Sequence, residues 1–147
     1  MPQFSRHATI DWSGPLLEGG KGDLTGGSGA FSLPVNFPAR IGDAGGVTSP
    51  EELIAAAHAT CYAMVINNVV GKMGGAIAKT HVTCTVTADA GPAGIKIVTS
   101  KLELTAQGLT GVDPHAFPQV AQDAEGKCPV SNALRGSVAI TVEAKVS

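Results

Sequence analysis

The feature that most constrains the fold of this chain is segment 49–73, SPEELIAAAHATCYAMVINNVVGKM, which predicts one long helix. Ser49 can cap its start, and Pro50 suits the first helical position. Glu52 completes an S-x-x-E capping box with Ser49. The glycine pair that begins at Gly74 ends the helix. These signals set both ends of the longest element in the chain.

Between residues 53 and 66, apolar side chains lie nearly all the way round this predicted helix. That pattern is typical of a central, enclosed helix rather than of an amphipathic surface helix. Four polar residues interrupt the wider apolar run 53–70, namely His58, Thr60, Asn67 and Asn68. They make the run a poor membrane span, so we expect a core helix.

Short alternating segments on both sides of the helix predict strands. Before it, ATIDW, GDLTG and FSLPVNF read as strands or hairpin arms joined by turns. After it, residues 79–91 alternate Val82, Cys84 and Val86 against threonines, which predicts a strand with one buried face. Residues 94–109 follow the AGPAG turn and are expected to form the partner strand, which predicts an antiparallel hairpin.

The remainder of the chain predicts two helices and a last strand. The helices are expected over roughly 114–126 and in CPVSNALRG, with Pro129 near the start of the second and Gly136 after its end. SVAITVEAKV alternates again and closes the chain as a strand. The order β–β–α–β–β–α–α–β predicts an α+β fold with antiparallel sheets. With 147 residues, we expect a single domain over 1–147 that buries a hydrophobic core.

The composition narrows the class of protein. Apolar residues make up 44% and charged residues 15%, so the surface is poor in charge and association would hide apolar area. The formal net charge is −2 without a Lys/Arg cluster, which argues against nucleic acid and anionic membranes as partners. The N-terminus lacks the apolar core of a signal peptide, and three cysteines are too few for a disulfide scaffold. We therefore expect a cytoplasmic protein with reduced thiols, unless they do redox work.

The three cysteines are candidates of different kinds. Cys61, in the middle of the apolar helix, is either a buried packing residue or a reactive thiol in a dry site. Cys128 precedes a proline at a predicted helix N-terminus, where backbone N–H groups and the helix dipole favour a thiolate. A cap residue without chemistry is the alternative for Cys128. Cys84 lies on the apolar face of its strand, which favours core packing.

His58 lies one turn before Cys61 on the same face of the helix. In one interpretation this H-x-x-C pair forms half of a metal site, with Cys128 and His115 as its remote partners. No paired C-x-x-C or H-x-x-x-H motif completes a zinc site. His58 as a base for Cys61 and His58 as a satisfied core histidine are the two other interpretations.

Two charged residues near the helix start are further candidates. Glu51 lies ten residues before Cys61, about 15 Å along a straight helix axis, so it cannot touch that sulfur directly. It either acts through a longer partner such as Arg40, in the glycine-rich loop before the helix, or faces a site in a neighbouring subunit. Otherwise it is a first-turn acid favoured by the helix dipole, and Arg40 is a solvated loop charge.

Two segments taken together resemble a known family. The P-E-E-L-I-A-A-A-H-A-x-C helix and the G-x-C-P-V-S turn are similar to those of the OsmC/Ohr family, the osmotically inducible and organic-hydroperoxide-resistance proteins. The form AAAHATC is more similar to the OsmC branch of the family than to the Ohr branch. The resemblance implies an intertwined α+β homodimer, in which two long central helices pack between sheets and both active sites lie at the subunit interface.

The same resemblance implies a thiol-dependent peroxidase and its site. Cys61 matches the peroxidatic cysteine, Cys128 the resolving cysteine, Arg40 the arginine that activates the thiolate, and Glu51 the glutamate that holds this arginine. The substrate is then an organic hydroperoxide, with hydrogen peroxide as a second one. A Cys61 sulfenic acid condenses with Cys128 to a disulfide, which a dithiol such as dihydrolipoamide or a lipoylated protein reduces. No metal, flavin or haem is implied.

A second function stays open beside the peroxidase. It is a non-enzymatic small-molecule binding protein that uses the same dimer-interface pocket, with thiols that merely tolerate oxidation.

Overall fold

The computed structural model describes residues 2–147, and the chain forms two compact units that divide between Leu53 and Ile54. The longest helix, α2 (Pro50–Lys72), begins in the first unit and continues through the second. The expectation of a single domain stays a prediction.

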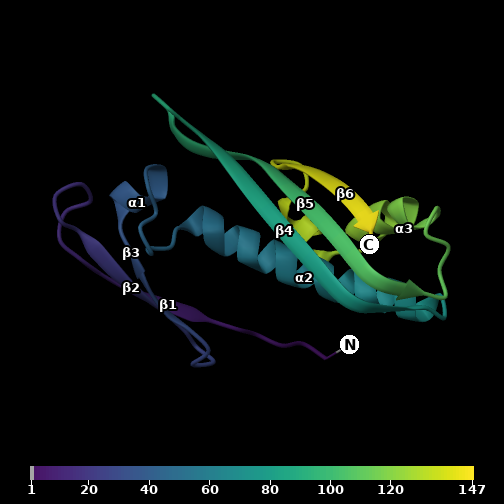
Figure 1. The fold of residues 1–147 in the computed structure, drawn as a ribbon. Coiled ribbons are helices and arrows are strands. Elements are labelled where there is room, and N and C mark those ends of the chain that lie inside the picture. Colours follow the sequence, from purple (N-terminus) through teal and green to yellow (C-terminus); the bar gives the residue numbers. More distant parts are fainter. Residues whose placement is uncertain (1) are drawn as a thin grey trace. The chain divides into compact units, whose positions relative to one another are not determined.

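The first unit contains a three-stranded antiparallel sheet in the order β1-β2-β3 (Figure 1). Its strands are β1 (Ala8–Ser13), β2 (Lys21–Gly26) and β3 (Ser32–Val35), which confirms the strands expected before the long helix. The third strand is shorter than its sequence segment because Asn36 caps a short helix, α1 (Phe37–Ile41). The Asn36 side chain accepts a hydrogen bond from the Ala39 N–H at 2.8 Å.

Both ends of α2 follow the local signals. The Glu52 N–H donates to the Ser49 hydroxyl at 3.1 Å, which confirms the predicted cap. The Glu52 carboxylate accepts from the Thr48 hydroxyl at 2.7 Å, a partner that the capping-box pattern does not predict. At the other end Gly74 has φ 83°, the left-handed conformation that glycine adopts without strain.

One stripe of α2 is buried, at His58, Tyr62, Ile66 and Val70. Its other faces carry exposed apolar residues, including Met64 with 69% of its surface accessible. The single chain therefore covers α2 on one side, whereas the sequence predicts a helix enclosed all round.

Length and composition also make α2 long and apolar enough to cross a membrane. The core helix of a soluble protein meets the same criteria, and a buried, hydrogen-bonded histidine fits such a helix.

The second unit contains a sheet in the order β4-β5-β6 (Figure 1). Its strands are β4 (Ala76–Gly91), β5 (Gly94–Thr110) and β6 (Ala139–Val146). The long β4–β5 hairpin is antiparallel, as predicted. On β4, Val82, Cys84 and Val86 are half-buried, whereas the threonines that alternate with them, at 83, 85 and 87, are exposed. The prediction of purely antiparallel sheets is wrong at one pairing, because β6 runs parallel to β5.

The parallel pairing follows from the connection between β5 and β6, which contains α3 (Phe117–Glu125) and α4 (Pro129–Leu134). A helical crossover returns the chain to the same edge in the same direction. The helix α3 starts later than the sequence suggests, because the Asp113 carboxylate accepts the His115 N–H at 2.9 Å and makes a turn there.

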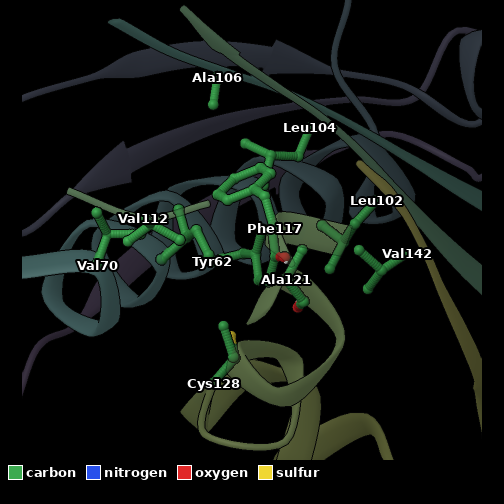
Figure 2. Close-up of a cluster of buried hydrophobic side chains, with 12 residues drawn as sticks. Tyr62, Val70, Leu102, Leu104, Ala106, Val112, Phe117, Ala121, Cys128 and Val142 are labelled. Atoms are coloured by element: carbon green, nitrogen blue, oxygen red, sulfur yellow. Dashed lines mark hydrogen bonds between the residues drawn. The ribbon is translucent and has the colours of Figure 1, made fainter. Parts of the chain in front are cut away.

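The core of the second unit lies between α2, α3 and one face of its sheet. Figure 2 shows the rings of Tyr62 and Phe117 together with Leu102 and Leu104 of β5. The Tyr62 hydroxyl donates to the Ala121 carbonyl at 2.8 Å, so the buried phenol is paired and ties α2 to α3. This packing fixes the middle of α2, where the candidate site begins.

Candidate active site

Two cysteines that are far apart in the sequence meet in the second unit. Cys61 lies in the middle of α2, and Cys128 is the residue directly before α4, at one end of the buried cluster in Figure 2. Cys128 and the Val130 backbone both act on the Cys61 pKa, so the start of α4 lies beside the Cys61 sulfur. Both cysteines are free thiols; Cys128 is fully buried and Cys61 is half-buried. Neighbouring thiols of this kind can be oxidised to an intramolecular disulfide.

The surroundings of Cys61 act against ionisation of its thiol. Burial is the largest cause that raises the Cys61 pKa; the Val130 N–H lowers it, and the Cys128 side chain raises it again. A thiolate is the nucleophilic form of cysteine. The second unit by itself therefore favours the protonated thiol, and an added positive charge would be needed to produce a thiolate near neutral pH.

The first unit holds a cation–carboxylate pair made by the two charged candidates. Arg40 Nε donates to both carboxylate oxygens of Glu51, at 2.8 and 3.1 Å. A terminal guanidinium nitrogen of Arg40 lies 2.8 Å from Glu51 Oε1. The side chains are 28% and 14% exposed, so the pair is partly shielded from water. Such a fork fixes the plane of a guanidinium as well as its position.

Glu51 therefore contacts Arg40 within one chain, which is the first of the interpretations that its position leaves open. Arg40 lies in the last turn of α1 and Glu51 in the first turn of α2. The Arg40–Glu51 pair and the Cys61–Cys128 pair belong to different units.

His58 is a satisfied core histidine. Its Nδ1 lies 2.6 Å from the Ser100 hydroxyl of β5, and its Nε2 lies 2.7 Å from the Ser131 hydroxyl of α4. All three side chains are fully buried. Burial lowers the His58 pKa, and the negative charge of Glu125 opposes this in part. A buried neutral imidazole results.

These hydrogen bonds decide between the interpretations of His58. Its ring nitrogens face serine hydroxyls rather than the Cys61 sulfur, and neither nitrogen is free to bind a metal in this arrangement. Within residues 2–147, no group of three or more His, Cys, Asp and Glu is placed to hold a metal ion. Cys84 packs beside the same group, with its sulfur 3.2 Å from the Ser100 hydroxyl.

No motif singles out Ser100 or Ser131 in the sequence. Ser100 shares the buried face of β5 with Leu102, Leu104 and Ala106. A polar residue in an otherwise apolar register is the signal that could have identified it, because a buried hydroxyl needs a partner. Ser131 lies within the C-P-V-S turn, but the turn itself does not reveal which residue it contacts.

An α+β fold with two neighbouring free cysteines places the chain in the class of proteins that carry a pair of cysteine thiols. Within that class the chain belongs to the OsmC family, since residues 42–143 match the family model described as OsmC-like protein. The chain is 33% identical over 137 residues to peroxiredoxin OsmC of Escherichia coli strain K12, covering 91% of this chain and 92% of that one. The resemblance inferred from the two motifs is confirmed.

Solved structures agree with this assignment. An organic hydroperoxide resistance protein OsmC from Legionella pneumophila superposes with a TM-score of 0.77 at 25% identity, covering 99% of both chains. OhrB of Bacillus subtilis shares the fold, with a TM-score of 0.70 at 24% identity over 95% of this chain and 98% of that one. The chain is thus a peroxiredoxin-like member of the OsmC/Ohr proteins. Glu51, Cys61 and Cys128 lie inside the family match, and Arg40 lies just before it.

Proposed function

We propose that this protein is a thiol-dependent peroxidase that reduces organic hydroperoxides. The observation that carries the proposal is the pair of free thiols, Cys61 and Cys128, which the fold brings together from α2 and the start of α4. Relatives named peroxiredoxin OsmC and organic hydroperoxide resistance protein support the same chemistry.

In the first step, the Cys61 thiolate attacks the distal oxygen of the hydroperoxide. The O–O bond breaks, Cys61 becomes a sulfenic acid, and the alkoxide leaves and takes up a proton to give the alcohol. In the second step, the Cys128 sulfur attacks the sulfenic sulfur, an S–S bond forms and water leaves. A dithiol such as dihydrolipoamide or a lipoylated protein then reduces the disulfide by thiol–disulfide exchange.

Arg40 supplies the positive charge that the first step requires. Burial raises the Cys61 pKa, and a guanidinium near the sulfur favours the charged form. Its donor fork also hydrogen-bonds the peroxide oxygens. Glu51 holds Arg40 by three close contacts from the start of α2, so in this proposal it acts through the arginine.

A homodimer is part of the proposal, and exposed apolar surface supports it. Every residue of β1 is exposed, and Trp12 on this strand keeps 41% of its surface accessible. On α2, Met64 is 69% exposed. Apolar area of this kind is favourable to bury, and a second copy of the chain is the partner that we propose. We place this soluble protein in the cytoplasm, where dithiol reductants are available.

The experiment measures dithiol-dependent consumption of cumene and tert-butyl hydroperoxide against hydrogen peroxide, with dihydrolipoamide and thioredoxin as alternative reductants. Turnover should vanish in Cys61→Ser, whereas Cys84→Ala, the control that removes the third thiol, should keep it. Cys128→Ser should let Cys61 over-oxidise, visible as added oxygen mass on its peptide. Full turnover in Cys61→Ser would refute the mechanism.

Intact mass separates the peroxidase from the binding protein. One equivalent of hydroperoxide should remove two hydrogens per chain, and the disulfide should map to Cys61 and Cys128. An unchanged mass would favour the binding protein instead.

A further inference from the structure

A buried chain of hydrogen bonds joins three elements beside the cysteine pair. His58 on α2 contacts Ser100 on β5 and Ser131 on α4, at 2.6 and 2.7 Å. Cys84 on β4 extends the chain through its 3.2 Å contact with Ser100. Burying the three polar side chains of His58, Ser100 and Ser131 is costly unless each is paired. None of the peroxidase steps uses this network.

The contacts between α2 and the start of α4 show what the network could do. Cys128 and the Val130 backbone both act on the Cys61 pKa there, which places the start of α4 next to the Cys61 sulfur. Both interactions involve the atom that reacts, so both change when Cys61 becomes a sulfenic acid. In the described chain, residues 2–147, the hydrogen bond between α2 and α4 is that of His58 with Ser131, and it does not involve Cys61.

Other bonds of this region tie α4 to the end of α3 rather than to α2. The Cys128 N–H donates to the Glu125 carbonyl at 3.1 Å. Arg135, directly after α4, donates to the Glu125 carboxylate at 2.8 and 2.9 Å. These bonds shape the α3–α4 corner, but they do not set its distance from Cys61.

We propose that His58 and Ser131 are positioning residues for disulfide formation, because their hydrogen bond holds the start of α4, and with it Cys128, against α2 while Cys61 changes its chemical state. The proposal rests on the peroxidase function for its role in turnover. The step that it serves joins the Cys61 S–OH and the Cys128 S–H into a disulfide and releases water. The imidazole contributes position and exchanges no proton in the net reaction.

The spacing along both helices suits this role. His58 lies three residues before Cys61, and Ser131 lies three residues after Cys128. Residues three apart on a helix are neighbours on one face, so the histidine–serine contact and the cysteine pair lie side by side. Ser100 holds the ring from the β5 side, and its hydrogen-bond partners are His58 and Cys84. A neutral imidazole donates from one nitrogen and accepts at the other, which suits two hydroxyl partners.

The test compares two serines that bind the same imidazole. Ser131→Ala removes the bond to α4, and Ser100→Ala removes the bond to β5 and leaves the α2–α4 link in place. The reduced proteins are equilibrated in glutathione buffers of graded ratio, and the Cys61–Cys128 disulfide is quantified by mass after alkylation. This measurement uses no peroxide, so it reports on the two thiols alone.

Ser131→Ala should lower the equilibrium constant for the disulfide about tenfold, since a free α4 must be ordered when the bond forms. Tenfold corresponds to about 1.4 kcal/mol, close to the net contribution of one hydrogen bond. Ser100→Ala should stay within about twofold of the unmodified protein. Equal constants for Ser131→Ala and the unmodified protein, or an equal loss in both serine variants, would overturn the proposal.

A second pair of variants guards against a folding defect in Ser131→Ala. Ser131→Thr and Ser131→Val have nearly the same shape and differ by the hydroxyl. The threonine variant should form the disulfide more readily than the valine variant. If the two are the same, the hydroxyl does not position Cys128 and the proposal fails.

Rapid mixing with cumene hydroperoxide separates this proposal from the peroxidase function. Ser131→Ala should oxidise Cys61 at the normal rate, form the disulfide about tenfold more slowly and accumulate more sulfinic acid. If the unmodified protein does not react with hydroperoxide, the peroxidase function fails, while the glutathione equilibrium still decides the role of Ser131. If Ser131→Ala forms the disulfide at the normal rate, the positioning role fails and the peroxidase function stands.

Discussion

Replacing Glu51 with glutamine removes the charge that holds Arg40 and keeps nearly the same side-chain shape. Glu51 makes close contacts with the guanidinium at 2.8, 3.1 and 2.8 Å. The next residue, Glu52, is a matched control in the same helical turn, since its carboxylate binds Thr48 rather than Arg40. Comparing Glu51→Gln with Glu52→Gln therefore separates the loss of the Arg40 contact from the loss of any acid at the helix start.

The size of the effect follows from the geometry of the pair. A hydrogen bond to a charged group contributes about 1.5–3 kcal/mol. The Arg40 and Glu51 side chains are 28% and 14% exposed, so solvent screening puts the pair at the lower end of that range. About 1.5–2 kcal/mol of lost positioning corresponds to a rate constant that is about 10- to 30-fold lower.

The assay is the second-order rate constant for the reaction of Cys61 with cumene hydroperoxide, followed by rapid mixing at several pH values. Glu51→Gln should react about 10- to 30-fold more slowly, and Glu52→Gln should stay within about twofold of the unmodified protein. A Glu51→Gln rate within about twofold of the unmodified protein would refute the role of Glu51. An equal loss in Glu52→Gln would instead assign the effect to the helix start.

Two further predictions concern stability. Burial lowers the His58 pKa from its ordinary value of 6.5, so the unfolded chain binds a proton more readily than the folded one. Stability should therefore fall as the pH drops below 6.5. The urea midpoint of His58→Gln should fall less between about pH 7 and 5 than that of the unmodified protein. Equal slopes of urea midpoint against pH in the two proteins would contradict this. Tyr62→Phe removes the donor to the Ala121 carbonyl and should lower the free energy of unfolding by about 1–3 kcal/mol; a urea titration that shows no loss would contradict it.

Local signals in the sequence determined most of the secondary structure. The start of α2 needs only Ser49 and the residues that follow it, and the end of α2 needs only a glycine that adopts φ 83° at Gly74. The β4–β5 hairpin likewise follows from an alternating pattern and a short turn. Each of these features depends on residues within a few positions of one another, which is the range in which propensity and capping act. The family followed from two intact motifs, the α2 helix and the C-P-V-S turn.

The tertiary structure decided which distant residues meet. The sequence alone leaves three interpretations of His58, and the positions of Ser100 on β5 and Ser131 on α4 select the satisfied core histidine. The same holds for Glu51, which cannot reach Cys61 along a straight helix and instead contacts Arg40 from the preceding short helix. The parallel pairing of β6 with β5 also depends on the path that α3 and α4 take between them.

The physical reason is the range over which each kind of information acts. Helix caps, glycine turns and two-residue alternation are properties of a local stretch of backbone, so they are readable in the sequence. Hydrogen bonds between buried side chains depend on how helices pack on a sheet, which is set by the whole core. The cysteines and their motifs were visible in the sequence, whereas the hydrogen bond that holds α4 beside α2 exists only once that core is formed.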